Sequence, residues 1–310
     1  MTTTGVMKPE CRLQPTLSIG KLFSSLVVAI PIFALSLWQN GQPSRWPGSD
    51  RVVAGRAEAV AVGDVTGVAG ATMRAWRLSA PDPRFGGLSA LAVDRSAFTA
   101  LTDSGVIVRF APPVGGDRLR ITLRDLPDGP GKETRKAGRD SESLLADPRG
   151  RGWWVGFEFH HKLWLYDRDF RRVLTRRALK VEWPPNRGAE ALVVGAAGVM
   201  ALPEGGGRAA GGTLIAPVGT SDATRLPDGR LVLLVRRFGL TGFDTRLWIA
   251  AGGGKPARRI ALGLGGLDNM EGIAAVPLAN GGMRLWIVSD DNFRPWMRTL
   301  LVALDLGPGI

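Results

Sequence analysis

Asn186-Arg187-Gly188-Ala189-Glu190-Ala191-Leu192 and Asp268-Asn269-Met270-Glu271-Gly272-Ile273-Ala274 repeat one short design within a chain of 310 residues. In each stretch a glutamate, Glu190 or Glu271, stands just ahead of an apolar run with the character of a β-strand. A repeat of this kind is typical of a radial array of similar units.

The same design recurs when the chain is written in register. Its five key positions are Ser89, Glu142, Glu190, Asp222 and Glu271. Their spacings run from about 32 to 53 residues, and several lie near 50, the period of one four-stranded propeller blade. The repeat therefore predicts an all-β chain with a single β-propeller of about five or six blades over residues 67–310.

A second position recurs about 14 to 19 residues after the first, where the next apolar run ends; such spacing fits a strand, a tight turn and an antiparallel return strand. The residues at this position are Asp103, Glu158, Glu204, Arg236 and Asp290. Turn signals separate the two runs, as in Pro227-Asp228-Gly229. The start of each first strand and the end of its return strand should share one face of the array, which then carries a ring of carboxylates.

Composition agrees with this fold. The chain has 42 Gly and 21 Pro residues, and no amphipathic helix is evident beyond the N-terminal region. We expect the ring to close by pairing residues 70–78 with residues 299–304, which removes the exposed sheet edges. Tryptophans in strand-like runs should pack between blades, with Trp296 as a candidate pocket wall.

The N-terminal region has the pattern of an export signal. Lys8, Arg12 and Lys21 precede an uncharged apolar run over residues 22–38. We expect a signal peptide or membrane anchor over residues 1–40, a linker over 41–66, and a periplasmic or secreted protein. Anchoring to the inner membrane through residues 22–38 is the alternative to cleavage near Ala34-Leu35-Ser36. The single cysteine, Cys11, precedes the apolar run, so the mature chain left after cleavage would contain no thiol.

The net charge of +12 and a pI near 11 raise the question of nucleic-acid binding. The basic residues are scattered through turns, as at Arg171-Arg172, without an aromatic-interleaved groove motif. We expect no nucleic-acid partner and favour an anionic substrate or a membrane surface.

Four short motifs in order resemble the phytase-like family that is described as having esterase-like activity. Besides the two stretches quoted first, they are Phe85-Gly86-Gly87-Leu88-Ser89 and Ser289-Asp290-Asp291-Asn292-Phe293. The resemblance runs from about residue 67 to residue 306. It implies a propeller distantly similar to the calcium-dependent phytases, which hydrolyse phosphate monoesters with metal ions held by carboxylates on one face.

The resemblance suggests a metal-dependent hydrolase of a small anionic ester, phosphoric or carboxylic. Ca²⁺ takes about six to eight oxygen ligands, which carboxylates supply. The candidate ligands are Glu142, Glu158, Glu190, Glu271, Asp290 and Asp291. Glu190 and Glu271 are the best candidates for ligands or water-activating groups. Arg236, with Arg237 as the alternative, stands where other blades carry an acid and could clamp the substrate anion.

Other interpretations remain open from the sequence. The acids could tie blades together by accepting backbone N–H bonds, and Arg236 could neutralise them. The propeller could be a non-catalytic module that binds a ligand or an envelope partner, since fold does not dictate function. A lactonase-like, metal-dependent propeller is a further option. A Ser-His-Asp triad is disfavoured, because His160 and His161 are adjacent and Ser89 lacks the final glycine of a nucleophile elbow.

Overall fold

The computed structural model describes Met1 and residues 48–94, 97–113, 116–184, 187–252 and 257–310. Regular structure in these residues is β, apart from the one-turn 3-10 helix η1 (Lys136–Gly138). No helix within them is long and apolar enough to cross a membrane. The predicted signal or anchor segment, its linker up to residue 47 and Asn186 all lie outside the described residues.

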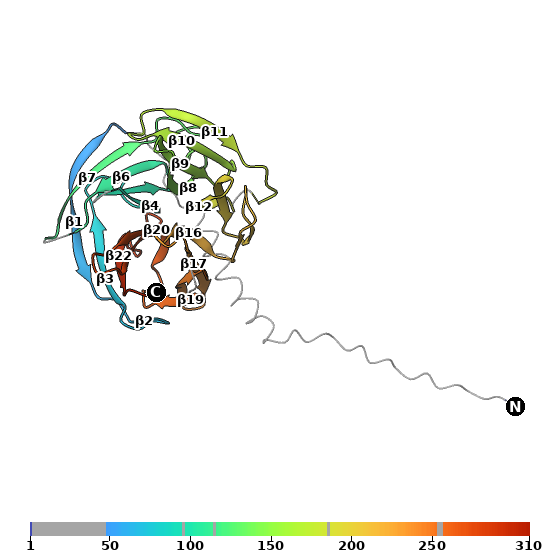
Figure 1. Ribbon diagram of the computed structural model, residues 1–310. Coiled ribbons are helices and arrows are strands. Elements are labelled where there is room, and N and C mark those ends of the chain that lie inside the picture. Colours follow the sequence, from blue (N-terminus) through green and yellow to red (C-terminus); the bar gives the residue numbers. More distant parts are fainter. Residues whose placement is uncertain (2–47, 95–96, 114–115, 185–186, 253–256) are drawn as a thin grey trace. The chain divides into compact units, whose positions relative to one another are not determined.

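Five inner strands surround the centre of the propeller (Figure 1). They are β4 (Leu88–Asp94), β8 (Ser141–Ala146), β12 (Ala189–Gly195), β16 (Thr220–Arg225) and β20 (Asn269–Pro277). Each packs beside the next, and β20 returns to β4, so the ring is closed. The described residues thus form five blades, and the predicted single propeller is confirmed.

An antiparallel hairpin opens every blade, as the spacing of the two recurring positions predicted. The second strands are β5 (Ala97–Thr102), β9 (Gly152–Phe157), β13 (Gly198–Pro203), β17 (Leu231–Gly239) and β21 (Met283–Asp290). The outer strands are β6 (Val106–Phe110), β7 (Arg118–Asp125), β10 (Lys162–Asp167), β11 (Val173–Ala178), β14 (Gly207–Arg208), β15 (Ile215–Ala216), β18 (Gly242–Ile249), β19 (Arg258–Leu262) and β22 (Leu300–Leu306).

Strands from the two ends of the propeller close the ring. β3 (Thr72–Ser79) pairs with β22, which confirms the predicted closure. β1 (Arg51–Val60) lies between β3 and β7 and joins the last blade to the first, while β2 (Val65–Thr66) extends the sheet of β19. Residues 51–66 are therefore part of the propeller, although we expected a linker there. The sequence pattern does not predict β1 as a strand, because the two residues that it buries, Gly55 and Ala57, are small.

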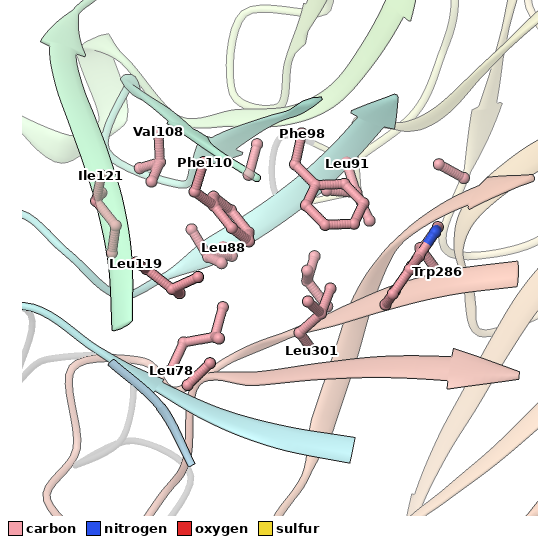
Figure 2. Close-up of a cluster of buried hydrophobic side chains, with 14 of the residues drawn as sticks. Leu78, Leu88, Leu91, Phe98, Val108, Phe110, Leu119, Ile121, Trp286 and Leu301 are labelled. Atoms are coloured by element: carbon pink, nitrogen blue, oxygen red, sulfur yellow. The ribbon is translucent and has the colours of Figure 1, made fainter. Parts of the chain in front are cut away.

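Aromatic and aliphatic side chains fill the space between the last blade and the first (Figure 2). The Phe98 ring meets the Trp286 ring edge-on, with centroids 5.0 Å apart, and its centroid lies 5.1 Å from that of Phe110. Burying one such side chain stabilises the fold by about 1.5–3 kcal/mol. This packing holds β4 and β20 side by side and so fixes where their first residues point.

Candidate metal and hydrolase site

A β-bulge marks the start of every inner strand. The pairing with the second strand skips one residue in each blade, and a bulge of this kind redirects the skipped side chain. The skipped residues are Ser89, Glu142, Glu190, Ser221 and Glu271. Four of them are the key positions of the sequence repeat. In the fourth blade the equivalent residue is Ser221 rather than the predicted Asp222, because the register shift lies between Thr220 and Asp222.

In the two blades that have a serine instead of a glutamate at the bulge, the serine hydrogen-bonds to the neighbouring blade. Ser89 Oγ donates to Ser141 O at 2.6 Å, and Ser221 Oγ donates to Met270 O at 3.0 Å. The buried carboxylate of Asp222 accepts hydrogen bonds from Ala223 N and Ile273 N, each at 2.7 Å. For Asp222, the blade-tying role considered from the sequence agrees with these contacts.

The second recurring position lies at the same end of the ring as the bulges. Asp103 N donates to Gly87 O at 2.9 Å, and Glu158 N donates to Asp140 O at 2.9 Å. Gly87 and Asp140 each lie just before an inner strand. The ends of the second strands thus adjoin the starts of the inner strands, which confirms the predicted shared face.

Asp140, Glu142 and Glu158 form the tightest acidic group in the described chain. Each offers one carboxylate oxygen, and these oxygens lie within 4.8 Å of one another. Burial, with Asp140 nearby, raises the pKa of Glu142 well above its usual value and that of Glu158 to about 8. Asp140 Oδ2 is buried and accepts no hydrogen bond within the described residues. Three crowded carboxylates with an unsatisfied oxygen form a donor set that fits a hard divalent cation.

Lys136 is the built-in counter-ion of this group. η1, in the loop before β8, places its Nζ 2.7 Å from Asp140 Oδ1 and 3.2 Å from Asp103 Oδ2. Burial disfavours the ammonium, but the attraction of Asp103 and Asp140 outweighs it and raises the Lys136 pKa. Sequence reasoning missed Lys136 and did not select Asp140. The available signals were the pair Asp140 and Glu142 two residues apart, and a lysine four residues earlier.

Arg236 and Glu271 form a second charged group on the other side of the ring. Arg236 Nη2 lies 2.8 Å from Glu271 Oε1 and 3.2 Å from Glu204 Oε1. Asn269 Nδ2 donates to Glu271 Oε1 at 2.9 Å, and Asn269 Oδ1 accepts a hydrogen bond from Arg236 Nη1. Burial raises the pKa of Glu271 to about 7, against the lowering effect of Arg236. These ion pairs agree with the view that Arg236 neutralises its neighbouring acids.

The pKa of Glu190 is affected by charges of both groups, the one around Asp140 and the one around Arg236. Glu190 is 4% exposed, and burial raises its pKa well above the usual value, helped by Glu158 and Glu204. Glu271 also raises the Glu190 pKa, and Arg236 lowers it. Glu190 therefore responds to the charge state of both sides.

Asp290 and Asp291 lie outside the tight group. Asp290 is buried and its Oδ1 accepts a hydrogen bond from Asn292 N at 2.6 Å. Asp291 accepts hydrogen bonds from Gly87 N at 2.9 Å and Thr299 Oγ1 at 2.7 Å. Since Gly87 precedes β4 in the first blade, the Asp291 carboxylate links the last blade to the first.

A pocket of about 660 Å³ is present, but at the other end of the propeller. Gly195, Arg225 and Arg230 are among its lining residues. Gly195 ends β12, whereas Glu190 stands near its start, so this pocket does not belong to the acidic site.

Fold and site together define a β-propeller with a partly buried carboxylate cluster that could hold a cation. A model of the phytase-like family, described as "Esterase-like activity of phytase", matches residues 83–213 and 208–293. The match covers more than half of the chain, and the protein belongs to this family. Esterases and phytases are hydrolases, so the family's description indicates a hydrolase-type function. No curated protein sequence matches the chain.

Solved structures resemble the chain only distantly. The catalytic domain of the Coprinopsis cinerea GH62 α-L-arabinofuranosidase has a TM-score of 0.40 at 12% identity and matches over 83% of this chain and 98% of its own. Hydrazine synthase from Kuenenia stuttgartiensis has a TM-score of 0.36 at 11% identity, over 71% of this chain and 63% of its own. A putative 6-phosphogluconolactonase from Bacteroides fragilis has a TM-score of 0.31 at 12% identity, over 77% and 90%. These likenesses carry no argument about the site.

Proposed function

We propose that the protein is an exported hydrolase of ester bonds that depends on a divalent cation, with Ca²⁺ as the ion and a small phosphate ester as the substrate. The observation that carries the proposal is the partly buried group of Asp140, Glu142 and Glu158, whose oxygens lie within 4.8 Å of one another. Export is proposed from the basic and apolar pattern of residues 1–40, and an anchor at residues 22–38 is its alternative.

Asp140, Glu142 and Glu158 would hold the ion, with Glu190 as the next carboxylate towards Arg236. A bound cation supplies Lewis-acid polarisation of an ester oxygen and lowers the pKa of water at the site. These separate roles are supported by geometry: the first group offers three carboxylate oxygens within 4.8 Å of one another, whereas Glu271 forms an ion pair with Arg236.

Glu271 would be the general base. Its pKa of about 7 is suited to accepting a proton from water near neutral pH. The hydrogen bond from Asn269 and the ion pair with Arg236 engage Oε1 and so orient the carboxyl group. Arg236 would act mainly as a positioning residue; to clamp a substrate anion it would have to release Glu204, whose side chain is 35% exposed.

The test uses the purified full-length chain. Ca²⁺ binding is measured by calorimetry, and hydrolysis of p-nitrophenyl phosphate and p-nitrophenyl acetate is followed with and without chelator. The double variant Asp140→Asn, Glu142→Gln should lose Ca²⁺ binding and hydrolysis together. Glu182→Gln, at an exposed acid outside the group, is the matched control and should keep both.

Each outcome has a definite meaning. Chelator-sensitive hydrolysis that disappears in the double variant supports the proposal, and the preferred ester shows which class is the substrate. Hydrolysis that persists in chelator refutes the dependence on a cation. Ca²⁺ binding without turnover of either ester points instead to the non-catalytic binding propeller.

A further inference from the structure

Large apolar side chains are exposed around one side of the acidic end. We call four of them the apolar rim: Phe238, Leu240, Leu267 and Trp296, which are 62%, 108%, 51% and 60% exposed. Phe238 lies at the end of β17, and the other three belong to turns at the same end of the propeller. Phe238 follows Arg236 by two residues, Leu267 precedes Asn269 by two, and Trp296 lies in the turn after Asp290.

The rim connects directly to the second charged group. The Phe238 ring meets the Phe243 ring edge-on with centroids 5.0 Å apart, and the Arg236 guanidinium lies 5.8 Å from the centre of the Phe243 ring. The same guanidinium contacts Glu271. An apolar surface therefore begins at the candidate catalytic group itself.

Backbone contacts hold the parts of the rim next to one another. Phe243 N donates to Gly266 O at 2.8 Å, which brings the turn that carries Leu240 against the loop that carries Leu267. A side chain on Gly242 would lie 1.9 Å from Gly266 O, so this approach requires glycine. Asp268 and Arg298, 2.5 Å apart, tie the same loop to the turn that carries Trp296.

The charges near the site argue against a substrate that is anionic all round. Carboxylates outnumber cationic side chains in the two acidic groups, where Lys136 and Arg236 are each held by two carboxylates. Four exposed apolar side chains beside the site instead offer a surface that gains free energy when it is covered by an apolar group.

We propose that the substrate is an amphiphilic ester, with its ester group at the acidic cluster and its apolar chain on the rim formed by Phe238, Leu240, Leu267 and Trp296. This inference rests on the proposed function, because it places the ester at the same site. It narrows the substrate class from small anionic esters to esters with an apolar substituent.

The test compares p-nitrophenyl acetate, butyrate and octanoate on the full-length chain with Ca²⁺. We expect kcat/KM to rise with chain length. The double variant Phe238→Ser, Leu240→Ser should lower the octanoate-to-acetate ratio by about tenfold, because it removes apolar surface that the octanoyl chain would cover. The control Val52→Ser, Leu174→Ser removes exposed apolar side chains that are 54% and 38% exposed on outer strands, and should leave the ratio unchanged.

A binding measurement separates this inference from the proposed function. Calorimetry should give tighter binding for octyl phosphate than for inorganic phosphate, and the rim variant should lose that difference. Chelator-sensitive turnover without any dependence on chain length overturns the amphiphilic substrate and leaves the hydrolase intact. Absence of turnover of these esters and of p-nitrophenyl phosphate, with rim-dependent octyl phosphate binding, overturns the hydrolase and retains the amphiphilic ligand. If light scattering shows a dimer that the rim variant dissociates, the rim is instead an interface between copies, and the inference is wrong.

Discussion

Replacement of Glu271 by Gln should stabilise the protein at alkaline pH when chelator is present. Glu271 is 5% exposed, and burial raises its pKa from 4.5 to about 7. Between these two values the folded state binds more protons than the unfolded state, so stability falls as pH rises. By this linkage, the ionisation of Glu271 lowers the free energy of unfolding by about 0.8 kcal/mol at pH 5 and by about 3.3 kcal/mol at pH 8. Gln resembles the protonated acid and does not carry this cost.

Urea unfolding, followed by tryptophan fluorescence at pH 5 and pH 8, measures the effect. The free energy of unfolding of the variant, relative to the wild type, should rise by about 2.5 kcal/mol between the two pH values. Glu182→Gln, at an exposed position, is the control and should show no such rise. A difference between Glu271→Gln and wild type that is independent of pH would refute the reasoning, because Glu271 would then titrate alike in both states.

Three further results are expected. Lys136→Met removes the ammonium that competes with a cation for Asp140, so calorimetry should show a Ca²⁺ affinity about tenfold higher than that of the wild type. The control Lys132→Met, at an exposed position of the same loop, should leave the affinity unchanged. Equal Ca²⁺ affinity in both variants would contradict the role of Lys136 as counter-ion. Phe98→Ala opens a cavity against Trp286 and should lower the free energy of unfolding by about 3–5 kcal/mol, and a loss below about 1 kcal/mol would mean that the blades repack. Ser221→Ala breaks a bond between blades and should cost about 1 kcal/mol in the same urea assay with ester hydrolysis retained; lost hydrolysis at unchanged stability would instead place Ser221 in the site.

The spacing of short motifs was enough to predict the propeller. Two recurring positions about 14 to 19 residues apart defined each hairpin, and the period defined the blade. The end of the ring at which the acids gather followed from the same spacing, because a strand and its antiparallel return must begin and end together. Glu142 and Glu158 illustrate this: they belong to the two strands of one hairpin and lie in one acidic group.

Register and long-range pairing could not be predicted in the same way. The bulge that makes Ser221 equivalent to Glu190 shifts the pattern by one residue, and only the pairing of β16 with β17 reveals it. β1 joined the propeller rather than a linker, since its partners β3 and β7 supply the hydrogen bonds that its small side chains do not suggest.

The sequence by itself determined the blade repeat, the acidic end and the family, because these depend on local patterns along the chain. Only the tertiary structure decided how the charges are shared. Lys136 pairs with Asp103 of the first blade as well as with Asp140 four residues on, and Arg236 pairs with Glu204 and Glu271 of the two neighbouring blades. Electrostatic partners are set by distance in space and by burial, and neither can be read from spacing along a chain.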